Sequence, residues 1–258
     1  EPQFLDWLVG NAISSAYVPP FMLRGLVAAV GANPENWSLG RLLVGVEPIP
    51  EGTLVKLRQH LPELSVINGY GPTEATICAT LYQIPDTDPE QPERSAPIGR
   101  PVINTDIRIL DEALNPVPGG VPGELFIGGT GLSRGYWRRP DLTAAAFVPD
   151  AHSPIPGGRL YRTGDLARWR PDGQLEFLGR EDFQIKLRGL RIEPAEIERA
   201  LEANSGVGKA LVTLDADRKM LIAYFTRQAA QLIDEQTLIA FLRDRLPEPM
   251  IPAAYVPL

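Results

Sequence analysis

The chain of 258 residues contains a single cysteine, Cys78, and two histidines, His60 and His152. One cysteine cannot form an internal disulfide, and this set of ligands is too small for the usual zinc cage. The N-terminal residues show no basic region ahead of an apolar run, and no apolar run reaches the roughly 18 residues of a membrane span. We therefore expect no signal peptide, no span, and a location in the reducing cytoplasm.

A surplus of basic residues is also missing, because the formal net charge is −7. Nucleic acids and anionic membranes bind basic surfaces that release their counterions, so neither is an expected partner. Hydrophobic residues make up 44% of the chain, which is enough to bury a core in two or more lobes.

The first third of the chain alternates helical patterns with short apolar runs. The patterns at 21–30 and 51–61 are typical of helices, and the runs at 42–44 and 64–67 are typical of buried strands. This order predicts an α/β fold class, with part of a parallel-sheet lobe over residues 1–97.

The pattern changes after Gln83. A stretch rich in Pro, Asp and Glu is followed by short strands separated by Pro-Gly turns, which predicts a small antiparallel β-barrel or sheet over residues 98–181. From residue 184 the order is strand, helix, two strands and helix, which predicts a C-terminal α+β lobe over 182–258. The glycine-rich block 128–135 lacks the spacing of a dinucleotide-binding loop, so we interpret it as a tight turn.

One segment, Asn68 to Cys78, combines an aromatic ring, a hydroxyl and a carboxylate around a Gly-Pro turn. Free backbone N–H groups and Thr73 suit a phosphate, and Tyr70 offers a flat face to a base. Glu74 would repel a bare phosphate, so it fits best where Mg²⁺ lies between the two negative groups. The alternative is a loop in which Thr73 or Glu74 caps the next helix.

Two further blocks occur at 158–165 and 177–193. Together with the first segment they resemble the patterns YGPTE, YRTGD and GRxDxQxKxRGxRIE of the adenylate-forming superfamily. The sequence resembles most the amino-acid-activating adenylation domain of nonribosomal peptide synthetases. Several long motifs in the same order are much more specific than any single glycine motif.

The resemblance implies an enzyme that uses ATP and Mg²⁺ to convert a carboxylic acid into an acyl-adenylate and pyrophosphate. The acyl group is then transferred to the phosphopantetheine thiol of a carrier domain. The partners that it implies are a peptidyl carrier domain, a condensation domain and, near Pro140 and Ala145, an MbtH-like protein. Ala145 has a simpler alternative as a helix residue that faces the core.

The resemblance also implies roles for particular residues. Tyr70 stacks on adenine, Asn68 reaches its edge, and Gly45, Val46 and Glu47 form the adenine wall. Thr73 contacts the α-phosphate, Glu74 binds Mg²⁺, and both are expected to act in catalysis. Asp165 holds the ribose hydroxyls, with Phe177 and Arg180 close to the nucleotide. The alternatives are a turn residue for Asp165, an interdomain ion pair for Arg180 and a core position for Phe177.

A pocket for the acyl side chain is implied at six positions, namely Tyr17, Leu43, Gly45, Gly69, Ile77 and Cys78. Their apolar character and two glycines favour an aromatic or bulky aliphatic side chain. We interpret Cys78 as a small hydrophobic residue and not as a nucleophile, because no histidine lies near it in the sequence. Val46 departs from the glycine that is usual in the family at this wall, and its side chain makes the adenine pocket tighter or shifted.

Three groups that the family uses are expected outside this sequence. The phosphate-binding loop and the aspartate that binds the substrate amine should precede Glu1, and the catalytic lysine should follow Leu258. The resemblance also implies that residues 182–258 form a C-terminal α+β lid subdomain that rotates between the two half-reactions, with a hinge at Asp182.

Two other functions stay open at this point. An acyl- or aryl-CoA ligase of the same superfamily would differ in the thiol that accepts the acyl group. A non-catalytic interaction module would keep the fold without the chemistry, although the presence of Glu74 and Asp165 argues against it. The sequence does not decide whether an amino, hydroxy or keto acid is activated.

Overall fold

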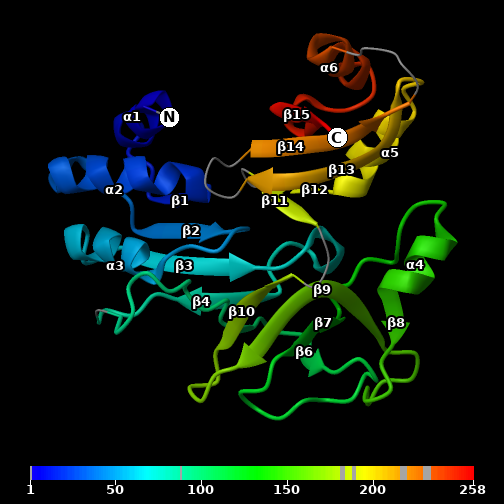
Figure 1. The fold of residues 1–258 in the computed structure, drawn as a ribbon. Coiled ribbons are helices and arrows are strands. Elements are labelled where there is room, and N and C mark those ends of the chain that lie inside the picture. Colours follow the sequence, from blue (N-terminus) through cyan, green and yellow to red (C-terminus); the bar gives the residue numbers. More distant parts are fainter. Residues whose placement is uncertain (1, 88, 181–183, 188–189, 216–219, 229–233) are drawn as a thin grey trace. The chain divides into compact units, whose positions relative to one another are not determined.

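The computed structural model describes residues 2–87, 89–180, 184–187, 190–215, 220–228 and 234–258. The chain divides into two compact units, Glu1–Asp182 and Phe183–Leu258, each of which is described by itself (Figure 1). The predicted hinge residue, Asp182, lies outside the described residues. Within the described residues, no helix is both long and apolar enough to cross a membrane.

The first sheet has five strands in the order β1-β2-β3-β4-β5. Its strands are β1 (Ser15–Tyr17), β2 (Arg41–Gly45), β3 (Ser65–Tyr70), β4 (Thr80–Gln83) and β5 (Arg100–Pro101). The first three are parallel, and β4 and β5 join them in antiparallel pairs. The predicted parallel sheet is confirmed. Because β5 pairs with β4, the sheet extends past residue 97, and the division of this unit into two parts stays a prediction.

Helices α1 (Pro2–Gly10), α2 (Leu23–Ala32) and α3 (Glu51–His60) pack against this sheet (Figure 1). The short 3-10 turns η1 (Pro20–Met22) and η2 (Pro34–Asn36) flank α2. Helix α2 buries Leu23, Leu26 and Val30, which lie on one face because they are three and four residues apart. They meet Leu42 of β2 and Leu54 of α3 in one core.

The second sheet is antiparallel throughout, with the order β10-β9-β7-β6 and with β8 paired to β9. Its strands are β6 (Thr105–Leu110), β7 (Gly123–Gly129), β8 (Phe147–Pro149), β9 (Arg159–Trp169) and β10 (Leu175–Arg180). Helix α4 (Pro140–Ala146) leads directly into β8. The predicted antiparallel region is confirmed, and residues 130–131 form the predicted turn after β7.

The two sheets share a core and a backbone bridge. Tyr70, Ala75 and Ala79 pack in one buried cluster with Leu125 and Leu175 of the second sheet. The N–H of Leu175 donates to the carbonyl of Gly99 at 2.8 Å. Gly99 has φ +92° and a Cβ there would lie 2.0 Å from the carbonyl oxygen of Leu81, so only glycine allows this approach.

The second unit contains a hairpin of β11 (Ile185–Leu187) and β12 (Leu190–Ile192) and a three-stranded sheet. The sheet consists of β13 (Val207–Asp215), β14 (Met220–Arg227) and β15 (Ala254–Pro257). Helices α5 (Pro194–Glu202) and α6 (Glu235–Arg243) bury Ile197, Leu201, Leu238 and Leu242 against it. The 3-10 turn η4 (Glu248–Met250) precedes β15. This is the α+β arrangement that the sequence predicts for the lid.

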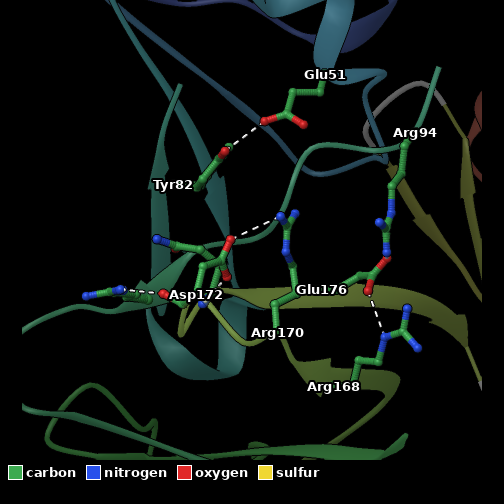
Figure 2. A network of polar contacts seen from close by, with 9 residues as sticks. Glu51, Tyr82, Arg94, Arg168, Arg170, Asp172 and Glu176 are labelled. Atoms are coloured by element: carbon green, nitrogen blue, oxygen red, sulfur yellow. Dashed lines mark hydrogen bonds and ion pairs between the residues drawn. The ribbon is translucent and has the colours of Figure 1, made fainter. Parts of the chain in front are cut away.

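A carboxylate between two arginines ties the loop before β5 to the second sheet (Figure 2). Glu176 of β10 accepts hydrogen bonds from Arg168 Nε of the paired strand at 2.8 Å and from Arg94 Nε at 2.9 Å. Glu176 is buried, whereas both arginines are partly exposed. Burial raises the pKa of Glu176, but the hydrogen bonds and charges of Arg168 and Arg94 outweigh it and hold the pKa below its ordinary value.

Glu176→Gln should lower the free energy of unfolding by about 1 to 2 kcal/mol at neutral pH, because two hydrogen bonds to a charged group are lost. The effect is no larger because both arginines are partly exposed and solvent screens the ion pairs. Since the pKa of Glu176 is lower in the folded state, the ion pairs stabilise above the unfolded pKa and their contribution is lost as the pH falls through the folded pKa. The difference between wild type and variant should thus narrow below about pH 4. Urea unfolding at several pH values measures both effects.

The matched control is Asp141→Asn, which removes an ion pair with Arg139 between two exposed side chains. It should shift the urea midpoint much less than Glu176→Gln. Equal shifts for the two variants would contradict a special role of the buried carboxylate.

Candidate functional site

The carboxylate of Asp165 is the centre of a buried polar cluster. The hydroxyl of Tyr70, at the end of β3, donates a hydrogen bond to Oδ2 of Asp165. Arg180 donates from one guanidinium nitrogen to Oδ1 of Asp165 at 2.6 Å and from the other to the carbonyl of Thr163 at 3.0 Å. Only 3% of Asp165 and 7% of Tyr70 is exposed. The motif residues Tyr70, Asp165 and Arg180, predicted from segments far apart in the sequence, therefore meet.

Strand pairing explains this meeting. Asp165 and Arg180 are direct partners in the antiparallel pair of β9 and β10, so their side chains lie on the same face. The Thr163 hydroxyl donates to Leu125 O at 2.6 Å and accepts from the N–H of Asp165 at 3.0 Å. Asp165 is thus part of a strand, and the alternative of a turn residue that closes on its own backbone is wrong.

Electrostatics keep the Tyr70 hydroxyl protonated. Burial raises its pKa well above the ordinary value, and the charge of Asp165 and the hydrogen bond to it raise the pKa further. Tyr70 is therefore a hydrogen-bond donor to a carboxylate across the physiological range. Its ring lies 6.4 Å from that of Phe177, which is half-buried against the same core.

Glu74 lies in the 3-10 turn η3 (Thr73–Ala75), directly after the Gly-Pro turn. Its Oε1 accepts a hydrogen bond from the hydroxyl of Tyr136 at 2.6 Å, and its carbonyl accepts from the N–H of Ser133 at 2.8 Å. Thr73 is exposed. The N-cap position of η3 is occupied by Pro72, which makes no side-chain cap. The alternative of a helix cap is therefore wrong for both residues.

Three residues near this turn have left-handed backbones. Val46 has φ 67°, Thr76 has φ 60° and Ile77 has φ 69°. Left-handed conformations are unfavourable for β-branched residues, and such strain tends to gather at functional sites. The family usually has glycine at position 46. Glycine adopts a positive φ without strain, so it suits the backbone conformation that Val46 has here.

Most residues of the predicted acyl pocket lie together. Gly45 pairs with Gly69, and a Cβ on Gly69 would lie 3.3 Å from Leu43 Cδ1 and 3.4 Å from Cys78 Sγ. Tyr17 pairs with Leu43, and its pKa is raised by burial first and then by the charges of Glu47 and Cys78. Ile77 is 66% exposed. Burial also raises the pKa of the Cys78 thiol, which fits an unreactive side chain.

Asn68 was predicted to reach adenine, and it is 95% buried. Its Nδ2 donates to Pro97 O at 2.8 Å, so the amide group is fixed by the protein itself. The stacking of adenine on Tyr70 also stays a prediction, because most of this ring is covered.

Two features of the site were missed by sequence reasoning. Tyr136 follows the glycine-rich block 128–135, and an aromatic residue directly after that block was the available signal. The bond from Tyr70 to Asp165 joins residues 95 positions apart, and no local pattern indicates it.

The family model described as "AMP-binding enzyme" matches residues 1–137, just over half of the chain. The chain belongs to this family. It is 44% identical over its whole length to phosphinothricin tripeptide synthetase PhsB of Streptomyces viridochromogenes, and 44% identical over 99% of its length to a dimodular nonribosomal peptide synthase of Bacillus subtilis.

A solved structure also resembles this chain. It is that of PA1221, "an NRPS protein containing adenylation and PCP domains", with a TM-score of 0.81 and 29% identity over the whole chain. The chain spans 22% and 10% of the lengths of the two curated relatives and 50% of the solved chain. The predicted fold class and the predicted resemblance to adenylation domains are confirmed.

Val46→Gly should raise the free energy of unfolding by about 1 kcal/mol, because relief of the left-handed strain exceeds the added chain entropy of glycine. The control is Val121→Gly, at an exposed valine without a positive φ, which should be destabilising. Urea unfolding of both variants measures the difference. Equal destabilisation by the two substitutions would rule out strain at Val46.

Proposed function

We propose that the chain is part of an amino-acid adenylation domain of a nonribosomal peptide synthetase. In the first half-reaction a carboxylate oxygen of the amino acid attacks the α-phosphorus of ATP, and pyrophosphate leaves. In the second, the phosphopantetheine thiol of a carrier domain attacks the acyl carbonyl, and AMP leaves. The observation that carries the proposal is the meeting of Tyr70, Asp165 and Arg180, all from family motifs, in a chain similar to such synthetases.

Asp165 is proposed to hold the ribose hydroxyls. A carboxylate has about four acceptor sites, and Tyr70 and Arg180 use only one on each oxygen. Arg180 supplies positive charge beside the nucleotide, and Phe177 packs near the ribose. At the base, Asn68 accepts from the adenine amino group through Oδ1, and the wall is formed by Gly45, Val46 and Glu47.

Glu74 is proposed to bind the Mg²⁺ that accompanies ATP, and Thr73 to donate to the α-phosphate. Among the described residues, no group of three or more His, Cys, Asp or Glu side chains could hold a metal. A single carboxylate nevertheless fits Mg²⁺, which proteins usually bind through one or two carboxylates together with substrate phosphates and water. When bound, the ion offsets the negative charge of the phosphates.

The substrate is proposed to be an amino acid with an aromatic or bulky apolar side chain. The space that a Cβ on Gly69 would fill is at contact distance from the side chains of Leu43 and Cys78. Tyr17 lies beside Leu43 on the neighbouring strand. Ile77 adds an apolar side chain at the rim. Apolar walls with glycine floors select for size and apolar surface.

The partners are proposed to be a peptidyl carrier domain and a condensation domain in the cytoplasm. Solved adenylation proteins such as PA1221 contain a PCP domain in the same chain. Ala145 is exposed on α4, so the alternative that it faces the core is wrong. An MbtH-like protein that contacts Pro140 and Ala145 is part of the proposal, and co-purification from cells that express both proteins would test it.

The test of the reaction is ATP–pyrophosphate exchange by the full-length protein with a panel of amino, hydroxy and keto acids. We expect exchange only with amino acids, and most with aromatic or bulky aliphatic ones. Product assays with a carrier domain or with free CoA then separate the two thiol acceptors. Release of acyl-CoA instead of carrier loading would favour the CoA ligase, and no exchange with any acid would contradict the proposal.

Asp165→Asn should reduce the preference for a ribose with intact hydroxyls. Wild type should bind ATP about tenfold or more tightly than 2′,3′-dideoxy-ATP, because hydrogen bonds to a charged group are lost with the analogue. The variant should show a smaller ratio, because the amide is neutral and has one acceptor oxygen instead of two, as measured by calorimetry on the full-length protein. Each protein is compared with itself, so a change in stability does not affect the ratio.

The matched control is Asp150→Asn. Asp150 is also a buried aspartate, and it lies 3.4 Å from Arg108 in an ion pair of the same unit. This variant should keep the preference for ATP. If Asp165→Asn kept it too, Asp165 would have no contact with the ribose.

A further inference from the structure

Tyr136 contacts Glu74 although 62 residues separate them. The phenol donates to Oε1 of the carboxylate at 2.6 Å. Both side chains are half-buried, so the contact lies where solvent and ligands have access. Glutamate has three side-chain torsions, and fixing them requires a partner that is itself held in place.

The backbone of Tyr136 is fixed by helix α4. Its N–H donates to Thr143 Oγ1 at 2.9 Å, and that hydroxyl donates to Arg139 O at 2.8 Å. Gly135 has φ +141°, and a Cβ there would lie 2.4 Å from Thr143 Cγ2. Only glycine permits this close approach, so the chain at this point is pinned against α4.

The ring of Tyr136 is fixed as well. It meets Phe147 edge to face, with centroids 5.8 Å apart and an interplanar angle of 67°. The hydroxyl therefore reaches Glu74 from a ring whose position is set by packing.

The loop that carries Glu74 is joined to the same segment by two other hydrogen bonds. The N–H of Ser133 donates to Glu74 O at 2.8 Å, and Thr76 Oγ1 donates to Gly131 O at 2.7 Å. The carbonyl of Glu74 and the side chain of Thr76, two residues later, are thus held by residues 131–133. The Tyr136 hydroxyl adds the contact that selects one orientation of the carboxylate.

We propose that Tyr136 is a positioning residue that orients the Glu74 carboxylate for the Mg²⁺ of bound ATP. This inference rests on the proposed role of Glu74 as a metal ligand. Groups that hydrogen-bond to a ligating carboxylate fix its orientation, and their loss typically lowers metal affinity by about 10-fold to 100-fold. Tyr136 acts through Glu74, whereas Thr73 and Asp165 are proposed to touch the nucleotide.

The test is Tyr136→Phe in the full-length protein, which keeps the ring and removes the hydroxyl. Binding of ATP is measured while free Mg²⁺ is titrated, and again in EDTA. The Mg²⁺ concentration for half-maximal binding should rise about 10-fold to 100-fold, with binding in EDTA unchanged. In pyrophosphate exchange, kcat should recover at saturating Mg²⁺. A purely structural role would lower binding in both conditions.

The matched control is Tyr82→Phe. Tyr82 is also half-buried and donates to a glutamate, Glu51 Oε1, at 2.7 Å (Figure 2). Its loss should leave the Mg²⁺ dependence unchanged. Thr143→Ala provides a second variant, which keeps the hydroxyl of Tyr136 but loosens its backbone and should raise the Mg²⁺ requirement by a smaller factor.

Glu74→Gln separates this inference from the proposed function. If it raises the Mg²⁺ requirement and Tyr136→Phe does not, the positioning role is overturned and the metal role of Glu74 stands. If Glu74→Gln leaves the Mg²⁺ requirement unchanged, both the metal role and the positioning role are overturned. A rise for Glu74→Gln and Tyr136→Phe, but not for Tyr82→Phe, supports the inference.

Discussion

The buried carboxylate of Asp165 joins the two sheets of the first unit, and the arrangement of the site depends on it. Tyr70 comes from the end of a strand in the first sheet, whereas Asp165 and Arg180 are paired in the second. A buried charge without partners would be strongly destabilising, so the carboxylate requires both the phenol and the guanidinium. The apolar cluster around Leu125 and Leu175 excludes water from these contacts. The same atoms thus fix the fold and form the core of the proposed nucleotide site.

The strained backbone of the loop after Tyr70 is stabilised by hydrogen bonds within the loop. The N–H of Ile77 donates to Pro72 O at 3.1 Å, and that of Cys78 to Thr76 O at 2.8 Å. The second bond closes a γ-turn of the rare kind with a positive φ at its central residue, Ile77. The N–H of Ala79 then donates to Tyr70 O at 2.8 Å, so the two ends of the loop meet. Strained conformations persist where several contacts determine them, and this loop carries Thr73 and Glu74.

Periodicity and motifs predicted the parts of the fold that depend on local sequence. The apolar spacing of α2 and the Pro-Gly turns of the second sheet each reflect neighbours within a few residues. Contacts between residues far apart in the sequence produce no local pattern that could predict them. Glu176 contacts Arg94 across 82 positions, and Tyr136 contacts Glu74 across 62. The left-handed backbone at Val46 was equally hidden, because valine rarely adopts it and only the surrounding structure imposes it.

A tyrosine donates to a carboxylate at three places in the described part of the chain, and exposure decides what each bond can do. Burial and the nearby carboxylate raise the pKa of all three phenols, so each remains a donor. Asp165 and Glu51 are buried, and their hydrogen bonds with Tyr70 and Tyr82 hold neighbouring elements together. Glu74 is only half-buried, and it alone of the three carboxylates lies in a loop open to solvent. Because a cation arrives from solvent and carries water with it, the exposure of Glu74 suits the ion-binding role that is proposed for it.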